Sequence, residues 1–456
     1  MVQKILIANR GEIACRIIES CHRMGLEAVA VYSDIDRHSR HVALADQAVA
    51  IGGSHARDSY LKVEAILAAG RETSATAIHP GYGFLSENAA FAQAVSDAGM
   101  IWIGPAPANI IDMGDKERAR KIASESGVPV LPGSARLSGG CNHALLGAAQ
   151  DVGYPLLVKA AAGGGGIGMR QVRSAQDLLA TVESTQSMAE KAFGDGGVYL
   201  ERFVPRAKHV EVQVFGFGDG TAIHLHDREC SIQRRFQKIV EEAPAPGISP
   251  TIRTELHRAA VSLACAQNYS GAGTVEFIYD CDRELAYFLE MNTRIQVEHP
   301  VTEMVTGIDL VEWQIRHALG SLGRISQDSI SVKGHAIECR LYAERPDKGF
   351  LPSPGTITQL DWPTVDERCR IDTGVRQGDQ ISFYYDPMIA KVIAYGEDRD
   401  GAIARQRHAL NELLIEGVGT NAQFLSDLIA DERFGAAETT TGFIDDYFMK
   451  RSTVSA

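Results

Sequence analysis

Polar and apolar side chains alternate most regularly between residues 289 and 298. Every even-numbered position from 290 to 298 is polar, and the odd-numbered positions from 289 to 297 are apolar apart from Thr293. A repeat of two residues is the period of a β-strand that buries one face. The sequence therefore predicts a strand that runs up to His299-Pro300, where the proline would end it. Its polar face would present Glu290, Asn292, Arg294, Gln296 and Glu298.

The preceding residues predict a hairpin. Residues 274–279 and 285–290 have the composition of strands, and residues 280–283 between them are typical of a turn. A turn centred on Arg283 places Glu276 opposite Glu290. Two like charges in this position destabilise a sheet unless a cation lies between them, and oxygen ligands favour Mg²⁺. Glu276, Glu290 and the amide oxygen of Asn292 therefore form a predicted magnesium site.

Residues 1–103 alternate between strand and helix patterns. Residues 4–8 and 27–32 are predicted strands with a helix over 12–24 between them, and further strands are expected at 48–51, 75–79 and 100–103. The first turn lacks the G-x-G-x-x-G of a dinucleotide site, so nicotinamide binding is not supported. Residues 79–88 follow the carboxyl end of a strand, where α/β sheets bind ligands, although a tight Gly/Pro turn explains them equally well. Ser86 is the expected cap of the next helix.

A run of glycines interrupts two predicted strands in the middle of the chain. The first of these strands carries Lys159 and leads into Gly163, Gly164, Gly165 and Gly166. The run lacks the terminal Gly-Lys-Ser/Thr of a Walker A loop. It predicts either an ordinary hairpin tip or a flap whose amides close over phosphates, with Lys159 behind it. The backbone entropy lost on ordering four glycines favours the ligand-gated flap.

The densest charge in the chain lies between the glycine run and the hairpin. After a predicted helix over 174–193, capped by Ser174, residues 209–217 predict a strand whose polar face carries His209, Glu211 and Gln213. Residues 227–246 then form a charge run. Such runs are usually solvated, but the position before the hairpin favours a phosphate or carbonate site. The run contains Gln233, Arg234, Arg235, Lys238, Glu241 and Glu242.

The last third of the chain predicts a further α+β domain. Residues 334–344 are a predicted strand with Glu338, Arg340 and Tyr342 on one side. Residues 399–414 are a predicted amphipathic helix. We expect this domain to pack Arg340 against the lobe that carries the metal site.

Length, charge and cysteine content narrow the class of protein. A chain of 456 residues suggests two or three domains, and its net charge of −13 argues against a nucleic-acid partner. The eight cysteines show no paired spacing, which favours buried thiols in a reducing compartment over a zinc or disulfide framework. No signal peptide or apolar run of membrane-spanning length is present, so we expect a soluble, cytoplasmic protein without a membrane partner.

Several segments follow one another in the order found in a known family. They are residues 7–13 (IANRGEI), 79–88 (HPGYGFLSEN), 113–116 (MGDK), 163–169 (GGGGIGM), 241–246 (EEAPAP) and 290–300 (EMNTRIQVEHP). On these segments the chain resembles, over almost its whole length, the biotin carboxylase subunit of acetyl-CoA carboxylase and related biotin-dependent carboxylases, which are ATP-grasp enzymes. The resemblance implies a mixed α/β and α+β fold. Its parts would be a Rossmann-like (pre-ATP-grasp) domain at 1–113, an ATP-grasp domain at 114–330 with a mobile Gly-rich lid at about 131–203, a C-terminal α+β domain at 331–446 and a tail at 447–456.

The resemblance also implies roles for individual residues. Glu298 would be the general base, Lys238 and Arg294 would hold bicarbonate, and Arg340 would steady the biotin enolate. Mg²⁺ or Mn²⁺ would bind at Glu276, Glu290 and Asn292. The implied ligands of the ATP phosphates are Lys116, Lys159, Gly163, Gly164, Gly165 and Gly166. Glu201 and His209 match adenine and ribose contacts, Gln296 and Val297 match the bicarbonate pocket, and Gln233 is also expected to bind a ligand.

The implied activity is the carboxylation of biotin at N1′ by ATP and bicarbonate, through carboxyphosphate. The chain has no Ala-Met-Lys-Met biotinylation segment, so the biotin carboxyl carrier protein and the carboxyltransferase are expected on other chains. The family suggests a homodimer. Acetyl-CoA is the default acceptor, which would place the protein in fatty acid biosynthesis, but another acyl-CoA, pyruvate or urea would use the same half-reaction.

Two positions depart from the commonest family pattern. Phe236 stands where His or Asn is more usual, and Ile167 replaces a basic residue in the glycine run. One alternative is therefore a nucleotide-binding regulatory subunit without turnover, although Lys238, Glu298 and Arg340 are intact. The other is an ATP-grasp ligase that uses a different carboxylate or an amine.

Overall fold

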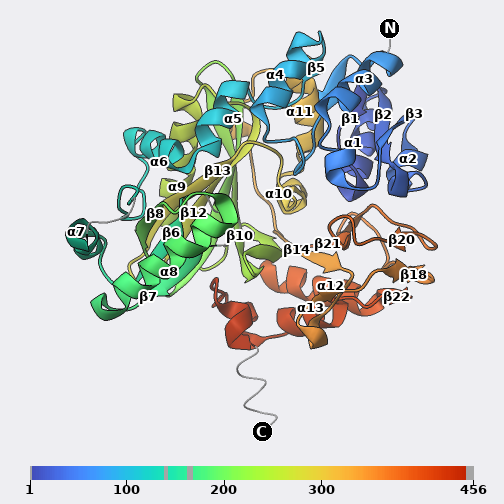
Figure 1. The fold of residues 1–456 in the computed structure, drawn as a ribbon. Coiled ribbons are helices and arrows are strands. Elements are labelled where there is room, and N and C mark those ends of the chain that lie inside the picture. The colour runs from blue at the N-terminus through green and yellow to red at the C-terminus, as the bar shows by residue number, and fades with distance from the viewer. Residues whose placement is uncertain (1–2, 138–141, 162–167, 448–456) are drawn as a thin grey trace.

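The structure, a computed structural model, describes residues 3–137, 142–161 and 168–447. Figure 1 shows the N-terminal part in blue at the upper right, a middle part with a green lobe at the left, and the C-terminal part in orange and red below. The predicted glycine flap at residues 163–166 lies outside the described residues.

The N-terminal part is a parallel sheet in the order β3-β2-β1-β4-β5. Ile5 and Ile7 pack with one set of helices, and Leu6 packs with another on the opposite face, which is why the central strand is apolar throughout. This strand order confirms the predicted Rossmann-like arrangement. The strands are β1 (Lys4–Ile7), β2 (Glu27–Ser33), β3 (Gln47–Gly52), β4 (Ala77–His79) and β5 (Ile101–Trp102). The helices are α1 (Gly11–Arg23), α2 (Arg40–Leu44), α3 (Val63–Thr73), α4 (Ala89–Asp97) and α5 (Pro107–Gly114).

The cap of α4 is Asn88, and the prediction of Ser86 was wrong. The Asn88 side chain accepts a hydrogen bond from the backbone N–H of Phe91. Ser86 lies earlier, in a turn where its own N–H donates to the carbonyl of Gly83. The turn is therefore longer than the sequence suggested, and the first helical residue is displaced accordingly.

The green lobe of Figure 1 is a three-stranded antiparallel sheet in the order β7-β6-β8, with two helices packed on it. Ser174 stands at the N-cap position of the second helix as predicted, but its hydroxyl donates to the Asp177 carboxylate instead of capping a backbone N–H. The strands are β6 (Leu156–Ala160), β7 (Met169–Val172) and β8 (Val198–Arg202). The helices are α6 (Lys116–Glu125), which leads into the lobe, α7 (Asn142–Val152) and α8 (Ala175–Phe193).

The middle and C-terminal parts share one eight-stranded sheet in the order β13-β12-β9-β10-β11-β14-β21-β19. The sequence predicted a further domain but did not reveal that its strands extend the preceding sheet, where Glu241 of β11 pairs with Glu338 of β14. The strands are β9 (Ala207–Phe217), β10 (Ala222–Arg234), β11 (Gln237–Ala243), β12 (Ser270–Asp280), β13 (Leu285–Asn292), β14 (His335–Tyr342), β19 (Cys369–Thr373) and β21 (Met388–Gly396).

Helices and short strand pairs complete this region. The helices are α9 (Pro250–Ala266), α10 (His299–Thr306), α11 (Leu310–Ala318), α12 (Arg399–Glu412), α13 (Ala422–Ile429) and α14 (Glu432–Gly435). The short pairs are β15 (Glu344–Arg345) with β16 (Leu351–Pro352), β17 (Gly355–Thr356) with β20 (Gln380–Ile381), and β18 (Gln359–Asp361) with β22 (Leu414–Glu416).

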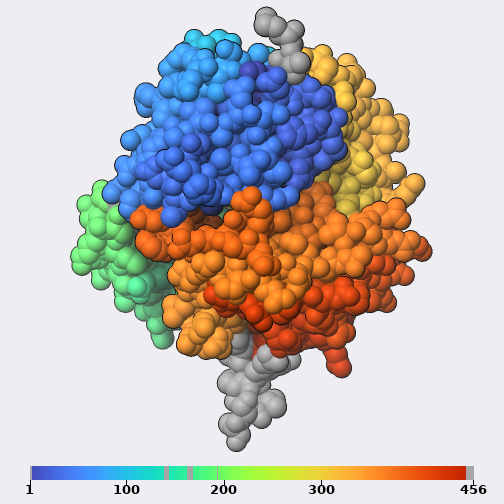
Figure 2. Space-filling model, turned by 90° about the vertical axis from the view of Figure 1, so that its right-hand side faces the viewer, coloured from blue at the N-terminus to red at the C-terminus, as the bar shows by residue number. Residues whose placement is uncertain are grey.

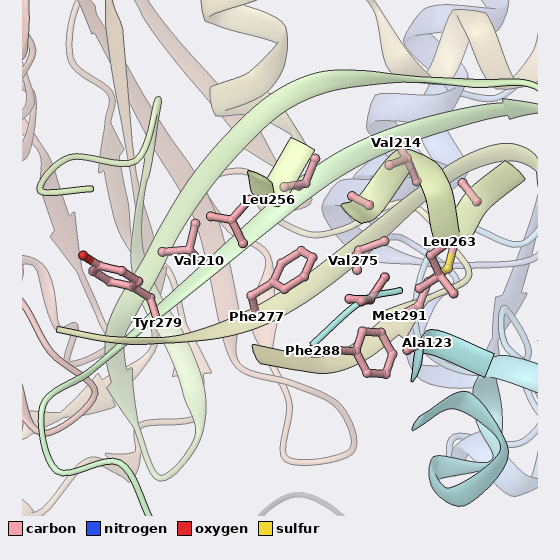
Figure 3. Packing of buried hydrophobic residues seen from close by; sticks show 14 of the residues in the cluster. Ala123, Val210, Val214, Leu256, Leu263, Val275, Phe277, Tyr279, Phe288 and Met291 are labelled. Atoms are coloured by element: carbon pink, nitrogen blue, oxygen red, sulfur yellow. The ribbon is translucent and has the colours of Figure 1, made fainter. Parts of the chain in front are cut away.

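One face of the large sheet packs on α9 and α6. Figure 3 shows Val210, Phe277 and Phe288 of the sheet against Leu256 and Leu263 of α9. Because side chains alternate along a strand, the residues between these apolar ones point to the opposite face. That opposite face carries the buried polar groups of the candidate site.

The hairpin has the predicted register, with Glu276 opposite Glu290. The prediction that its second strand continues to Glu298 was wrong, because β13 ends at Asn292, which pairs with Thr274. Residues 293–298 then leave the sheet, and Ile295 is buried in the cluster beneath α1 and α11. The alternation in these residues therefore reflects burial of single side chains without a neighbouring strand.

Buried ion pairs join the three parts around α10. Glu303 accepts hydrogen bonds from Arg16 of α1 at 2.9 Å and from Arg370 of β19 at 2.6 Å. Burial alone would raise the pKa of Glu303, but the two guanidinium groups hold it below its ordinary value. Figure 2 shows the blue N-terminal residues resting on the orange C-terminal ones. Glu303 thus links α1 and β19 to α10, and each guanidinium has a second carboxylate, Asp309 for Arg16 and Asp372 for Arg370.

Two expectations about composition agree with the structure. Within the described ranges, no helix is long and apolar enough to cross a membrane. The seven cysteines in those ranges are free thiols, and five of them are buried.

Replacement of Glu303 by alanine should destabilise the fold by about 3–5 kcal/mol, because it removes the carboxylate that two buried guanidinium groups share. The matched control is Glu125→Ala, which removes an exposed partner of Lys121 and should cost less than about 1 kcal/mol. Urea unfolding of both variants checks this. Equal unfolding midpoints would show that the buried network contributes nothing.

Candidate active site

Lys238 lies at the centre of the polar face of the large sheet. Its ammonium donates hydrogen bonds to Glu211 of β9 at 2.6 Å, to Glu276 of β12 at 2.9 Å and to Glu298 at 2.6 Å. Burial alone would lower the pKa of Lys238, but the three carboxylates raise it well above its ordinary value. The ammonium is therefore charged and holds three strands and the start of α10 together.

Glu298 lies between two cations. One carboxylate oxygen accepts from Lys238, and the other accepts from Nη2 of Arg340 at 2.9 Å. Nε of Arg340 donates to Glu241 at 2.7 Å. Burial would raise the pKa of Glu298, but Lys238 and Arg340 hold it well below its ordinary value. Glu298 is thus in the ionised form that a base requires at neutral pH.

The negative charge of Glu276 is well compensated by hydrogen-bond donors and cations. It accepts hydrogen bonds from Lys238 and, on the same oxygen, from Asn292 at 2.8 Å and Gln296 at 3.2 Å, and Nε2 of His209 lies 2.8 Å from the other oxygen. Burial opposes ionisation of Glu276, yet Lys238 and His209 hold its pKa below the ordinary value.

The carboxylate of Glu290 lacks such hydrogen-bond donors: among the described residues, no side chain donates a hydrogen bond to it. Burial, and then repulsion from Glu276, raise the pKa of Glu290. A pair of acids with one uncompensated member, beside the amide of Asn292, is an oxygen-donor set that suits Mg²⁺ or Mn²⁺. The three predicted metal-site residues are therefore together, and their chemistry fits the ion.

Arg294 connects this region with the N-terminal part. It donates to Glu87 in the 79–88 loop at 3.0 Å, to Gln296 at 2.9 Å and to Asn292 at 3.1 Å. The backbone carbonyl of Val297 accepts from the buried Lys391 at 2.9 Å. The loop that follows β4 therefore reaches the site, as its position at a sheet edge suggested.

The remaining predicted ligands fall into two groups. Gln233 donates to Nδ1 of His209 at 2.7 Å, which places both beside Glu276. In the lobe, Glu201 accepts from Lys159 and, at 2.9 Å, from Arg120.

Lys116 and Phe236 lie at the edge of these groups. Lys116 is exposed at the start of α6. Phe236 lies at the tip of the β10–β11 hairpin with 63% of its surface exposed. Tyr199 of the lobe is influenced by the acid pair of the large sheet. Burial and Glu201 raise the pKa of Tyr199 to about 12, and the charge of Glu290 contributes to this rise.

Three residues of the site had no role in the sequence prediction. Glu211 was expected only on a polar strand face, yet it binds both Lys238 and Arg228. Arg228 is completely buried and also donates to Thr302 of α10 at 3.0 Å. Glu241 holds Arg340. The signal for Glu211 was its alternation with valines. Arg228 and Glu241 lay within the charge run at residues 227–246, whose position favoured an anion site, but no local pattern showed which of its charges would be buried.

Known families match the three parts of the chain. Residues 1–110 match the biotin carboxylase N-terminal domain, residues 115–324 the ATP-binding domain of the carbamoyl-phosphate synthase L chain, and residues 338–446 the biotin carboxylase C-terminal domain. Biotin carboxylase 1 of Bacillus subtilis is 47% identical over 447 residues, which are 98% of this chain and 99% of that protein. The chain belongs to the biotin carboxylase family.

Longer proteins and solved structures extend this family relationship. The α subunit of rat mitochondrial methylcrotonoyl-CoA carboxylase is 49% identical over 98% of this chain, which spans only 62% of that subunit. A biotin carboxylase domain dimer of Hydrogenobacter thermophilus 2-oxoglutarate carboxylase, solved with MgADP, ADP and bicarbonate, is 44% identical with a TM-score of 0.91 over 98% of each chain. The family and the three-part architecture expected of a biotin carboxylase are thus confirmed.

Replacement of Lys238 by methionine should cost about 3–5 kcal/mol at neutral pH, because three buried carboxylates lose their cation. The deficit should shrink as the pH falls towards 4.5. In the parent, the depressed pKa values of Glu276 and Glu298 keep both acids ionised over this range, so their contribution to stability is lost only below the unfolded-state pKa of about 4.5. In the variant these acids lack the ammonium and protonate at a higher pH. Acidification therefore removes their unpaired charges and reduces the deficit.

Thermal unfolding of parent and variant from pH 8 to pH 4.5 measures this difference. The exposed Lys121→Met is the matched control for loss of a lysine. A deficit that does not change with pH would contradict the charge balance described here.

Proposed function

We propose that this protein carboxylates biotin at N1′ with ATP and bicarbonate, the first half-reaction of a biotin-dependent carboxylase. The observation that supports this best is the ionised Glu298 between Lys238 and Arg340, next to an acid pair suited to a divalent metal. This arrangement provides a base, an anion site and a nucleotide-metal site on one sheet face.

ATP would bind between the lobe and the large sheet. Lys116, Lys159 and the glycines at 163–166 would bind the phosphates, and Glu201, His209 and Gln233 would contact the nucleoside. Glu276, Glu290 and Asn292 would hold Mg²⁺ or Mn²⁺, which when bound offsets negative charge on the phosphates. The hydrogen bonds of Lys159 to Glu201 and of Gln233 to His209 keep these donors ordered before the nucleotide arrives.

Bicarbonate would be held by Lys238, Arg294, Gln296 and the backbone of Val297. Glu298 accepts the bicarbonate proton, and the bicarbonate oxygen attacks the γ-phosphorus while the bond to the oxygen of ADP breaks. The products of this step are carboxyphosphate and ADP. A depressed pKa makes Glu298 a weak base, so neutralisation of Lys238 by the incoming anion is needed to raise its basicity.

Biotin would react beside Arg340. Carboxyphosphate breaks down to CO₂ and phosphate, the phosphate removes the N1′ proton, and the resulting enolate attacks CO₂. Arg340 would stabilise the enolate oxygen with the same guanidinium that pairs with Glu241 and Glu298. Glu241 keeps this guanidinium in place because it accepts a hydrogen bond from its Nε.

The proposed partners are a biotin carboxyl carrier protein and a carboxyltransferase. A homodimer is proposed from the dimeric structure of the Hydrogenobacter domain. The final acceptor stays open, because relatives act in methylcrotonoyl-CoA and 2-oxoglutarate carboxylases by name, whereas acetyl-CoA and fatty acid biosynthesis were the default expectation. A cytoplasmic location also stays a prediction.

The direct test of the proposal is ADP release by the purified chain with and without bicarbonate and free biotin. The proposal predicts release that requires bicarbonate and is stimulated by biotin. Release that ignores biotin would contradict it and favour another ATP-grasp ligase. A folded protein that binds ATP without turnover would favour the regulatory alternative.

Glu298→Gln should lower turnover by about 10²- to 10⁴-fold, because it removes the general base, while ATP affinity changes little. The matched control is Glu338→Gln on β14. Burial raises the pKa of Glu338 well above its ordinary value, which favours the neutral acid, so this position should tolerate the amide. Steady-state rates and nucleotide binding measure both. A Glu298→Gln rate near that of the parent would remove Glu298 as the base.

Glu290→Gln should raise the Mg²⁺ concentration needed for half-maximal rate by at least about tenfold, because the uncompensated member of the acid pair loses its charge. Glu284→Gln, an exposed change in the same hairpin, is the control. Mg²⁺ titrations at saturating ATP check this. An unchanged requirement in Glu290→Gln would place the metal elsewhere.

A further inference from the structure

Three histidines gather on the other face of the large sheet, away from Lys238. Consecutive residues of β10 mark the two faces: Arg228 points to Glu211 and Thr302 in the candidate active site, whereas Asp227 points to His257 of α9. His224 and His226 precede Asp227 on the same strand. The cluster of His224, His226 and His257 is therefore separated from the carboxylation site by the sheet itself.

The rings of this histidine cluster are close enough to share one ion. One potential ligand atom from each residue lies within 4.8 Å of the other two. The ring centroids are 4.0 Å apart for His224 and His257, 5.1 Å for His224 and His226, and 5.2 Å for His226 and His257. Three imidazoles that converge in this way match the His₃ ligand set of open zinc sites.

A β-bulge brings the first two histidines into the cluster. β10 is out of register with β9 between His224 and Asp227, since these residues pair with Val214 and Val212. One extra residue therefore lies on β10, and His226 has a φ of 65°. A left-handed backbone is uncommon for a residue other than glycine, and bulges of this kind redirect side chains. The strand thus departs from regular geometry at the point where His226 turns towards α9.

Hydrogen bonds around the cluster orient two of the rings. Nε2 of His257 lies 2.7 Å from a carboxylate oxygen of Asp227, whose other oxygen accepts from the backbone N–H of Ala245 at 2.7 Å. A carboxylate that accepts the N–H of a histidine is the usual outer partner of a metal-binding imidazole, and it leaves Nδ1 of His257 for the ion. Nδ1 of His224 accepts from the backbone N–H of His226 at 3.3 Å, which leaves its Nε2.

Two of the three histidines are also reachable from solvent. His224 and His226 are partly exposed, so an ion can enter and keep water in its remaining position. Burial and the neighbouring imidazoles lower the pKa of His224 to about 3, and burial and His257 lower that of His226 to about 4. Neutral imidazoles are the form that binds transition metals.

We propose that His224, His226 and His257 form a binding site for a divalent transition-metal ion, with Zn²⁺ as the best match. Nitrogen ligands select Zn²⁺ over Mg²⁺, so this site is distinct from the oxygen-ligand site at Glu276 and Glu290. The ion joins β10 to α9 and, through Asp227, to the loop after β11. It therefore cross-links elements on the face of the large sheet opposite Lys238.

The test is a Zn²⁺ titration of the metal-free full chain by calorimetry, with excess Mg²⁺ present to occupy the oxygen-ligand site. The proposal predicts one Zn²⁺ per chain, a higher Tm in its presence, and the intense visible absorption of tetrahedral Co²⁺ when Co²⁺ replaces it. His226→Asn, which keeps a residue that tolerates positive φ, and His224→Gln should each weaken binding by at least about 100-fold.

His408→Ala removes an exposed histidine of α12 and is the matched control, which should bind Zn²⁺ as the parent does. The circular dichroism of each variant establishes that it is folded. Zn²⁺ affinity equal to that of the parent in both folded cluster variants, or no Zn²⁺ binding by the folded parent, would overturn the proposal and leave the histidines as a packing cluster.

Discussion

Three carboxylates, from β9, β12 and the residue before α10, lie within 2.9 Å of the single ammonium of Lys238. Buried charges persist only when they are paired and hydrogen-bonded, so these four groups fix one another. The same constraint extends outward, since Glu211 also accepts from Arg228 and Glu298 from Arg340. The continuous sheet makes this possible, because it brings β14 beside β11 and so delivers Arg340 to the same face.

The balance of charge divides the site into two halves. On one side Glu290 lacks a partner among the described residues, and its raised pKa indicates that a cation is needed there. On the other side Lys238 and Arg340 both donate hydrogen bonds to Glu298, and these two cations would also bind an anion. The first half therefore suits a metal-bound nucleotide, and the second half suits a small oxyanion. A reaction between the nucleotide and the oxyanion is favoured because the two halves lie on the same face of the sheet.

Local pattern predicted most of the elements and the metal-site group of Glu276, Glu290 and Asn292, whereas the roles of the other site residues came from the resemblance to a known family. The alternation and the turn around Arg283 gave the register of Glu276 with Glu290, and apolar runs gave the N-terminal parallel sheet. The predictions that failed concern features that depend on residues distant in the sequence. β13 stops at Asn292 because no strand pairs with the residues beyond it, whereas the burial of Ile295 maintains the alternation. The buried pairing of Arg228 with Glu211 depends on two neighbouring strands, and the histidine cluster needs a bulge and α9 that no local sequence pattern reveals.

The central claim is that the anion at Lys238 attacks ATP directly. Bicarbonate labelled with ¹⁸O tests it, because an oxygen of bicarbonate becomes part of carboxyphosphate and leaves in the phosphate. Mass spectrometry of the phosphate released in the presence of biotin should show one ¹⁸O atom in each molecule. Unlabelled phosphate accompanying ADP would mean that water attacks the nucleotide, and would contradict the assignment of this site to bicarbonate.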